Sequence, residues 1–91
     1  MRPVPRHNLP MKARVFVSLK STVLDPQGQT VRAALGGLGY RDIAEVRQGK
    51  FFDLTLAEGA SREQAEKDIE TIAHEVLANP VIEEYRVEFL D

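Results

Sequence analysis

The sequence contains no cysteine, no continuous apolar run near twenty residues and no excess of basic side chains. The absence of cysteine excludes disulfides, thiolate catalysis and zinc–thiolate sites. A chain with neither cysteine nor an apolar run long enough for a membrane helix is most simply cytoplasmic. Its formal net charge is −2, whereas a dedicated nucleic-acid binder usually carries a strong basic excess. The composition therefore predicts neither a nucleic-acid nor a membrane partner.

The length and the apolar content indicate one small globular domain. The chain has 91 residues, of which 43% are hydrophobic and 29% charged. A domain of this size forms one modest core and has little apolar material left for a deep pocket. The first ten residues contain three prolines, two arginines and no carboxylate, so we expect a flexible leader over residues 1–10. Residues 11–91 are expected to form the single folded domain.

The periodicity of the apolar residues predicts six elements. Alternation with period two indicates strands, and apolar residues at i, i+3 and i+4 indicate helices. In chain order we expect strand 12–20, a helix from Pro26 to about Gly39, strands 42–48 and 50–56, a helix from Ser61 to Asn79, and strand 81–90. The order βαββαβ predicts an α+β two-layer sandwich, in which a four-stranded, mainly antiparallel sheet carries both helices on one face. This is the ferredoxin-like arrangement.

Two phenylalanines are predicted on the face of the sheet that the helices leave open. In strand 12–20 the alternation points Phe16 away from the core, and in strand 50–56 it does the same for Phe51. A partly apolar open face favours pairing with a second copy. We therefore expect Phe16 and Phe51 to mediate self-association.

The segment Asp25-Pro26-Gln27-Gly28 opens the first predicted helix. Asp25 has the short acceptor side chain of an N-cap, and Pro26 suits the first helical turn. Gly28 leaves that turn with almost no side-chain cover, which suits close approach by another backbone or by an anion. On local physics alone, an ordinary strand-to-helix connection is the favoured explanation of the same residues.

A second candidate contact is a small basic turn. Gly49 favours a tight hairpin turn between strands 42–48 and 50–56. This turn would place Arg47 and Lys50 at its tip. Such a tip could bind a phosphate, an RNA backbone or an acidic protein surface. Two charges on a tip are usually just solvated.

The residues that enzymes use for chemistry are scarce in this chain. His74 is the only histidine within the predicted domain, and it lies off the apolar stripe of its helix without a nucleophile at helical spacing. Glu83 falls on the inward register of the last strand, where a salt bridge with Arg47 or Lys50 is a better explanation than catalysis. We therefore expect no catalytic, cofactor-binding or metal-binding residues, and a small binding module that forms dimers.

Four blocks of sequence, in order along residues 11–91, resemble the PurS family, the small subunit of phosphoribosylformylglycinamidine (FGAM) synthase. Residues 1–10 have no counterpart in the family. The blocks are Val15-Phe16-Val17-Ser18-Leu19-Lys20, Val23-Leu24-Asp25-Pro26-Gln27-Gly28, Val46-Arg47-Gln48-Gly49-Lys50 and Leu77-Ala78-Asn79-Pro80-Val81-Ile82-Glu83-Glu84-Tyr85.

This resemblance implies a subunit without an active site of its own. In the family, a PurL-like synthetase subunit binds the nucleotide substrate and ATP with magnesium, and a PurQ-like glutaminase subunit releases ammonia from glutamine. The small subunit is required for these two to work together in de novo purine biosynthesis, and it forms homodimers or higher homo-oligomers. On this basis we expect contacts with the larger subunits at Asp25, Pro26, Gln27 and Gly28, and at Arg47, Gly49 and Lys50.

Two other functions are compatible with the pattern. Ferredoxin-like dimers often bind amino acids or nucleotides at their interface, so a small-molecule-binding regulatory domain is the first alternative. An RNA-binding module on the open sheet face is the second, because Phe16 and Phe51 could stack on bases. The acidic balance of the chain disfavours RNA.

Overall fold

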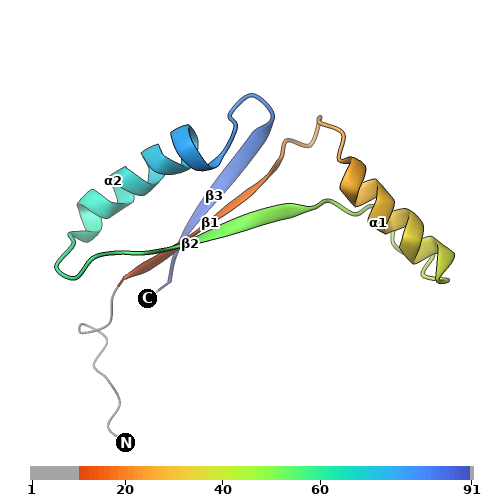
Figure 1. Cartoon of the computed structure of the whole chain (residues 1–91), viewed down its shortest axis with the longest axis horizontal. Coiled ribbons are helices and arrows are strands. Elements are labelled where there is room, and N and C mark those ends of the chain that lie inside the picture. Colours follow the sequence, from red (N-terminus) through yellow and green to blue (C-terminus); the bar gives the residue numbers. More distant parts are fainter. Residues whose placement is uncertain (1–10, 91) are drawn as a thin grey trace, which may run out of the picture.

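The computed structural model describes residues 11–90, so the predicted leader 1–10 and Asp91 lie outside the described residues. Three strands, two α-helices and one π-helical turn follow one another along the chain (Figure 1). They are β1 (Lys12–Leu19), α1 (Pro26–Gly37), β2 (Gly49–Thr55), α2 (Arg62–Ile72), η2 (Ala73–Leu77) and β3 (Glu83–Leu90).

The sheet has three antiparallel strands in the order β2-β1-β3. The α+β class and the antiparallel pairing are as predicted. The predicted fourth strand is absent from the described residues, so the sheet has three strands instead of four. Val15 in the central strand lies opposite Phe52 on one side and Val87 on the other. The alternation therefore predicted correctly which side chains of these strands face the core.

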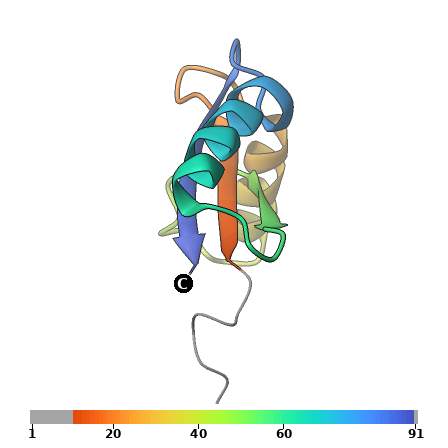
Figure 2. The same ribbon diagram turned by 90° about the vertical axis from the view of Figure 1, so that its left-hand side faces the viewer.

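The core lies between one face of the sheet and α2 (Figure 2). Val15 and Val17 are almost fully buried, as is Ile69 from α2. Ser61 caps this helix, because its hydroxyl oxygen accepts the backbone N–H of Gln64. The apolar residues of β2 and β3 that face α2 are half-buried around this centre: Phe52, Leu54, Tyr85, Val87 and Phe89.

The prediction of a strand over residues 42–48 is wrong. Residues 43–48 form no helix or strand, and the chain continues through Gln48 directly into β2 instead of turning back. The glycines with positive φ are Gly39 and Gly59, so Gly49 does not adopt the left-handed geometry of a tight hairpin turn. Alternation alone cannot make a strand, because each strand needs a partner for its backbone hydrogen bonds.

The prediction that both helices cover one face of the sheet is also wrong. Only α2 does so, while α1 projects away from the sheet together with residues 38–46 (Figure 1). We call residues 26–46 the arm. Its helix buries only Gly28. The Cα radius of gyration is 17.9 Å, compared with about 12 Å for a compact domain of this length. The chain is therefore an arch and not a closed two-layer sandwich.

The second predicted helix changes its geometry before it ends. After Ile72 it continues as the π-helical turn η2, in which the N–H of Ala78 bonds to the carbonyl of Ala73, five residues earlier. The wider turn shifts the phase of the apolar stripe. Val76 lies at helical spacing from Ile69 and Ala73 and would face the core in a regular helix, but it is 73% exposed for this reason.

Candidate functional site

Asp25 joins the start of the arm to the start of the sheet's edge strand. Its Oδ1 accepts the backbone N–H of Gly28 at 3.0 Å, which confirms the predicted N-cap. Its Oδ2 accepts the backbone N–H of Gln48 at 2.7 Å, immediately before β2. These two hydrogen bonds lower the pKa of Asp25 below its usual value, and the bond from Gln48 has the larger effect.

Gly28 is buried by residues 44–48, the return segment that leads the chain back into β2, and is therefore not a bare helix entrance. A β-carbon at position 28 would lie 2.1 Å from the carbonyl oxygen of Val46. The close backbone approach that the sequence suggested therefore occurs within the molecule. Pro26 and Gln27, on the same turn, are exposed. Contact of these four residues with a larger subunit stays a prediction.

The predicted basic tip does not form, because no hairpin brings Arg47 and Lys50 together at a turn. The guanidinium of Arg47 donates to the carbonyl of Lys20 at 3.0 Å and lies 3.9 Å from Glu45. Lys50 pairs with Val17 in the sheet, and its ammonium lies 5.6 Å from the centre of the Phe52 ring. Gly49 starts β2 beside the backbone of Val17.

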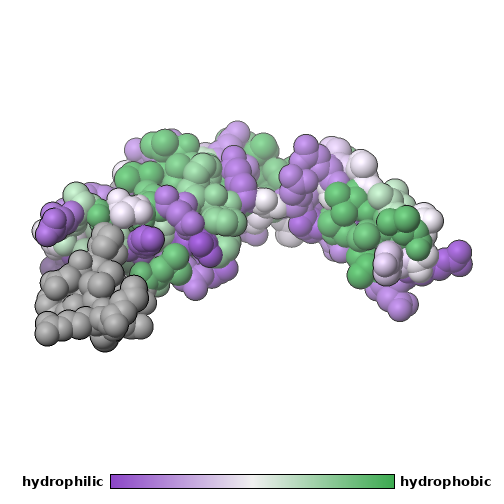
Figure 3. Space-filling view, turned by 60° about the horizontal axis from the view of Figure 1, so that its bottom comes forward, coloured by the Kyte–Doolittle hydropathy of each residue, from purple (hydrophilic) through white to green (hydrophobic). Residues whose placement is uncertain are grey.

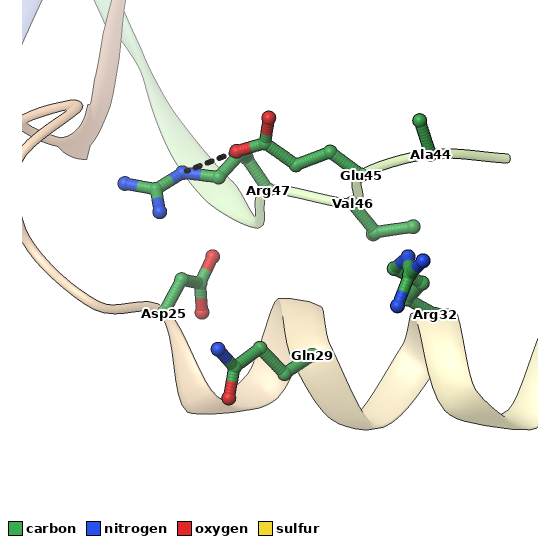
Figure 4. A pocket seen from close by; sticks show the side chains of 7 residues that line it. All are labelled: Asp25, Gln29, Arg32, Ala44, Glu45, Val46 and Arg47. Atoms are coloured by element: carbon green, nitrogen blue, oxygen red, sulfur yellow. Dashed lines mark ion pairs between the residues drawn. The ribbon is translucent and has the colours of Figure 1, made fainter.

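An open hollow of about 310 Å³ lies between α1 and the return segment (Figure 4). Its lining mixes charged, amide and apolar side chains: Asp25, Gln29, Arg32, Ala44, Glu45, Val46 and Arg47. Neither a nucleophile paired with a base nor a phosphate-binding glycine loop lines this hollow. Its geometry suits contact with a partner surface better than chemistry.

No group of three His, Asp or Glu side chains among residues 11–90 is arranged to hold a metal ion. The same part of the chain has no helix with the length and apolarity to cross a membrane. His74 is exposed and meets the edge of Tyr85, with ring centroids 6.3 Å apart. The Tyr85 hydroxyl donates to Glu70 at 2.9 Å, which raises the pKa of Tyr85. Glu83, the inward carboxylate, accepts the N–H of Asn79 at 2.7 Å in place of the expected salt bridge.

The open face of the sheet carries the predicted aromatic pair. Phe16 and Phe51 lie opposite each other in the register, with ring centroids 6.1 Å apart. Arg14 stacks over Phe51 at 4.5 Å, and Arg86 over Phe16 at 4.2 Å. Arg14 also binds both carboxylate oxygens of Asp53, which lowers the pKa of Asp53. A role of this surface in self-association stays a prediction.

The arm has an exposed apolar surface whose location the sequence analysis missed (Figure 3). Leu38 is 75% exposed and Tyr40 62% exposed, and Val31 and Ile43 are also exposed. The helical spacing of Val31 and Leu35 predicts instead that this stripe is buried on the chain's own sheet. Such a pattern predicts that a face will be buried, but does not identify the molecule that buries it.

Comparison with known proteins identifies the family. The family described as "PurS: Phosphoribosylformylglycinamidine (FGAM) synthase" matches residues 12–91. The phosphoribosylformylglycinamidine synthase subunit PurS of Bacillus subtilis is 42% identical over 81 residues, which cover 85% of this chain and 89% of the relative.

Solved structures agree with the sequence match. A crystal structure of Bacillus subtilis PurS has a TM-score of 0.78 at 40% identity, covering 89% of this chain and 99% of that chain. A chain in a structure of PurLQS from Thermotoga maritima has a TM-score of 0.76 at 31% identity, covering 90% of this chain and 100% of that chain. The resemblance carried by the four sequence blocks is thereby confirmed, and the chain belongs to the PurS family of phosphoribosylformylglycinamidine (FGAM) synthase.

Proposed function

We propose that this chain is the non-catalytic small subunit of FGAM synthase in purine biosynthesis and works in the cytoplasm. It joins a PurQ-like glutaminase subunit to a PurL-like synthetase subunit, so that ammonia from glutamine reaches formylglycinamide ribonucleotide. ATP with magnesium and glutamine are used by those partners and not by this chain. Its similarity to a chain of PurLQS supports the assignment. The observation that carries it is the match of residues 12–91 to the PurS family.

The chemistry of ammonia explains why such a subunit is needed. Ammonia that escapes into water is protonated and no longer acts as a nucleophile. Two active sites that share it must therefore be held together with a sheltered route between them. A rigid protein with several exposed contact surfaces can hold two larger subunits in register without any reactive group of its own.

The contacts with the larger subunits are proposed around the base of the arm. Pro26, Gln27 and Lys50 are exposed there and available to a partner. Asp25 and Gly28 are buried against the backbone of this chain, and Arg47 and Gly49 contact it although they are exposed. In this proposal they contribute by fixing the shape of the contact surface.

The apolar surface of the arm is proposed to pack on a second copy of the chain. The receiving site is the inner face of the sheet next to β2, where Phe52 and Leu54 stay half-exposed because α2 leans toward β3. This lean is seen in the hydrogen bond from Tyr85 to Glu70 and in the stacking of Arg62 over Phe89. A two-fold exchange of arms would cover both apolar surfaces at once.

Charge favours the same pairing. The only charged residue of α1 is Arg32. By contrast, α2 carries four acidic and two basic residues. A partner's α1 lying beside α2 would therefore meet a surface of opposite sign, which favours its approach in that orientation.

Reconstitution tests the enzymatic role. The chain is co-expressed with a PurL-like and a PurQ-like subunit, and FGAM formation from glutamine is compared with formation from added ammonium salt. We expect glutamine-dependent turnover to require this chain, while ammonia-dependent turnover by the synthetase persists without it. Full glutamine-dependent turnover in its absence would contradict the proposal, as would turnover by the isolated chain.

A pair of charge substitutions on α1 tests the arm contact. Leu35→Glu puts a charge in the apolar stripe, whereas Ala33→Glu puts the same charge about 200° around the helix, away from it. We expect Leu35→Glu to run as a monomer on sedimentation and Ala33→Glu to associate like the parent chain. Equal association of both variants would exclude the arm as the contact between copies.

A further inference from the structure

The arm and the sheet are connected by two chain segments that run side by side. Residues 20–25 lead from β1 into α1, and residues 44–48 lead back from the arm into β2. The Arg47 guanidinium donates to the carbonyl of Lys20 at 3.0 Å, and the N–H of Gln48 donates to Asp25 at 2.7 Å. Neither segment is helix or strand, so these cross-links determine how rigid the junction is.

Asp25 differs from every other polar residue in the described part of the chain. It is the one buried polar or charged residue there, with 5% of its surface exposed. Its two carboxylate oxygens bind backbone N–H groups of different elements, Gly28 in the first turn of α1 and Gln48 at the entrance to β2. An N-cap needs only the first of these bonds. The second ties the helix to the sheet.

The contact between Gly28 and Val46 restricts the same junction from the other side. The first turn of α1 rests against the carbonyl of Val46 with no space for a β-carbon. If α1 rotated toward the return segment, backbone atoms would collide. If it rotated away, the hydrogen bond between Asp25 and Gln48 would break. The arm is therefore held in one direction as long as both contacts are intact.

We propose that Asp25 is a positioning residue that fixes the direction of the arm relative to the sheet. This inference rests on the proposed packing of the arm on a second copy. A partner copy then receives an arm that already points the right way, and association does not have to restrict a mobile helix. Asp25 thereby acts on assembly through the geometry of the arm, without touching the partner.

One conservative substitution separates this role from simple helix capping. Asn is as good an N-cap as Asp, so Asp25→Asn can keep its oxygen on the N–H of Gly28. Its amide NH2 cannot accept the N–H of Gln48, because it is a donor only. The variant keeps the cap and loses the bridge. Gln48→Pro removes the same hydrogen bond from the donor side.

The absence of cysteine from the chain makes the arm direction directly measurable. Cysteines are introduced at the exposed positions Ala33 in α1 and Thr71 in α2, in the Leu35→Glu background that keeps the chain monomeric. Spin labels on both report the arm-to-sheet distance distribution by pulsed electron resonance. Labelled protein is diluted about tenfold with unlabelled protein, so that only distances within one chain contribute. Asp53→Asn, which removes a carboxylate from the open sheet face, is the control.

We expect the distance distribution to be at least twofold broader in Asp25→Asn and in Gln48→Pro, with the helical circular dichroism signal unchanged. Asp53→Asn should match the parent. An unchanged distribution in both junction variants would overturn the inference, as would a broad distribution already present in the parent. Should Asp25→Asn fail to fold, the distribution of Gln48→Pro alone decides between these outcomes. Should both fail to fold, Asp25 is a folding residue and the positioning role is rejected.

Assembly is measured separately, with position 35 restored to leucine. We expect Asp25→Asn to weaken self-association at least tenfold. If Leu35→Glu does not disturb association, the proposed arm packing fails, while the distance measurements still decide the role of Asp25. The two failures are therefore distinguishable.

Discussion

The carbonyl oxygen of Val46 lies 2.1 Å from the point where a β-carbon at position 28 would stand, so only glycine fits under the return segment. The two residues come from opposite ends of the arm. Their contact brings the first turn of α1 against the chain that leads into β2. This close backbone approach is one of the two contacts that set the shape of the junction.

We expect Gly28→Ala to lower the free energy of unfolding by about 1–3 kcal/mol, the usual cost of forcing extra atoms into a packed site. The clash is with a backbone carbonyl, which cannot move aside as a flexible side chain can. Gly36→Ala in the same helix meets nothing within 4 Å. It should raise stability by about 0.5–1 kcal/mol, because alanine favours the helix. Urea unfolding of both variants checks the pair, and equal effects would contradict the proposed fit.

The sheet and the helix that covers it could be predicted from sequence because their pattern is local. Val15 and Val17 alternate with polar or outward side chains, and Asp25 and Ser61 each precede a helix with a suitable acceptor. These signals depend on the residue and its near neighbours. The inward and outward orientation of the strand side chains and the N-caps at Asp25 and Ser61 accordingly agree with the structure.

The direction of the arm could not be predicted in this way. The stripe of Val31 and Leu35 is the same whether α1 packs on its own sheet or on another molecule. Likewise, the pattern predicts that residues 42–48 pair across a turn at Gly49, but the chain runs through Gln48 directly into β2 and leaves them without a strand partner. The hydrogen bond between Asp25 and Gln48 spans 23 positions and ends on a backbone N–H, which leaves no trace in the side-chain pattern.

The lowered pKa of Asp25 predicts a loss of stability in acid. The folded state favours the carboxylate, so its contribution is fully present above the unfolded value of about 3.9 and is lost as the pH falls through the lower folded value. We therefore expect the stability difference between the parent and Asp25→Asn to be largest near neutral pH and to shrink as the pH falls below about 4. Urea midpoints over this range measure it. A difference that stays constant with pH would show that the carboxylate charge is not what stabilises the junction.

The core beneath α2 is expected to be sensitive to the loss of a single methyl group. Ile69 is 1% exposed and packs with Val15 and Val17 in the core. Ile69→Val should cost about 0.5–1.5 kcal/mol. Val76→Ala, on the π-helical turn where the side chain is 73% exposed, should change stability by no more than about 0.5 kcal/mol. If Val76→Ala lowered stability as much as Ile69→Val, the result would contradict the phase shift that places Val76 outside the core.

The open face with Phe16 and Phe51 is expected to act after the arms have paired. Three strands of about eight residues present about 380 Å² at the usual strand spacing, well below the roughly 800 Å² per partner of a stable interface. An arm-exchanged pair would offer two such faces. Phe16→Asp should therefore leave the dimer intact and remove larger assemblies, whereas Leu35→Glu should remove both. Sedimentation velocity over a concentration series distinguishes these species. A monomeric Phe16→Asp variant with its arm in place would instead make the open face the primary contact between copies, because the dimer would then depend on the aromatic pair and not on α1.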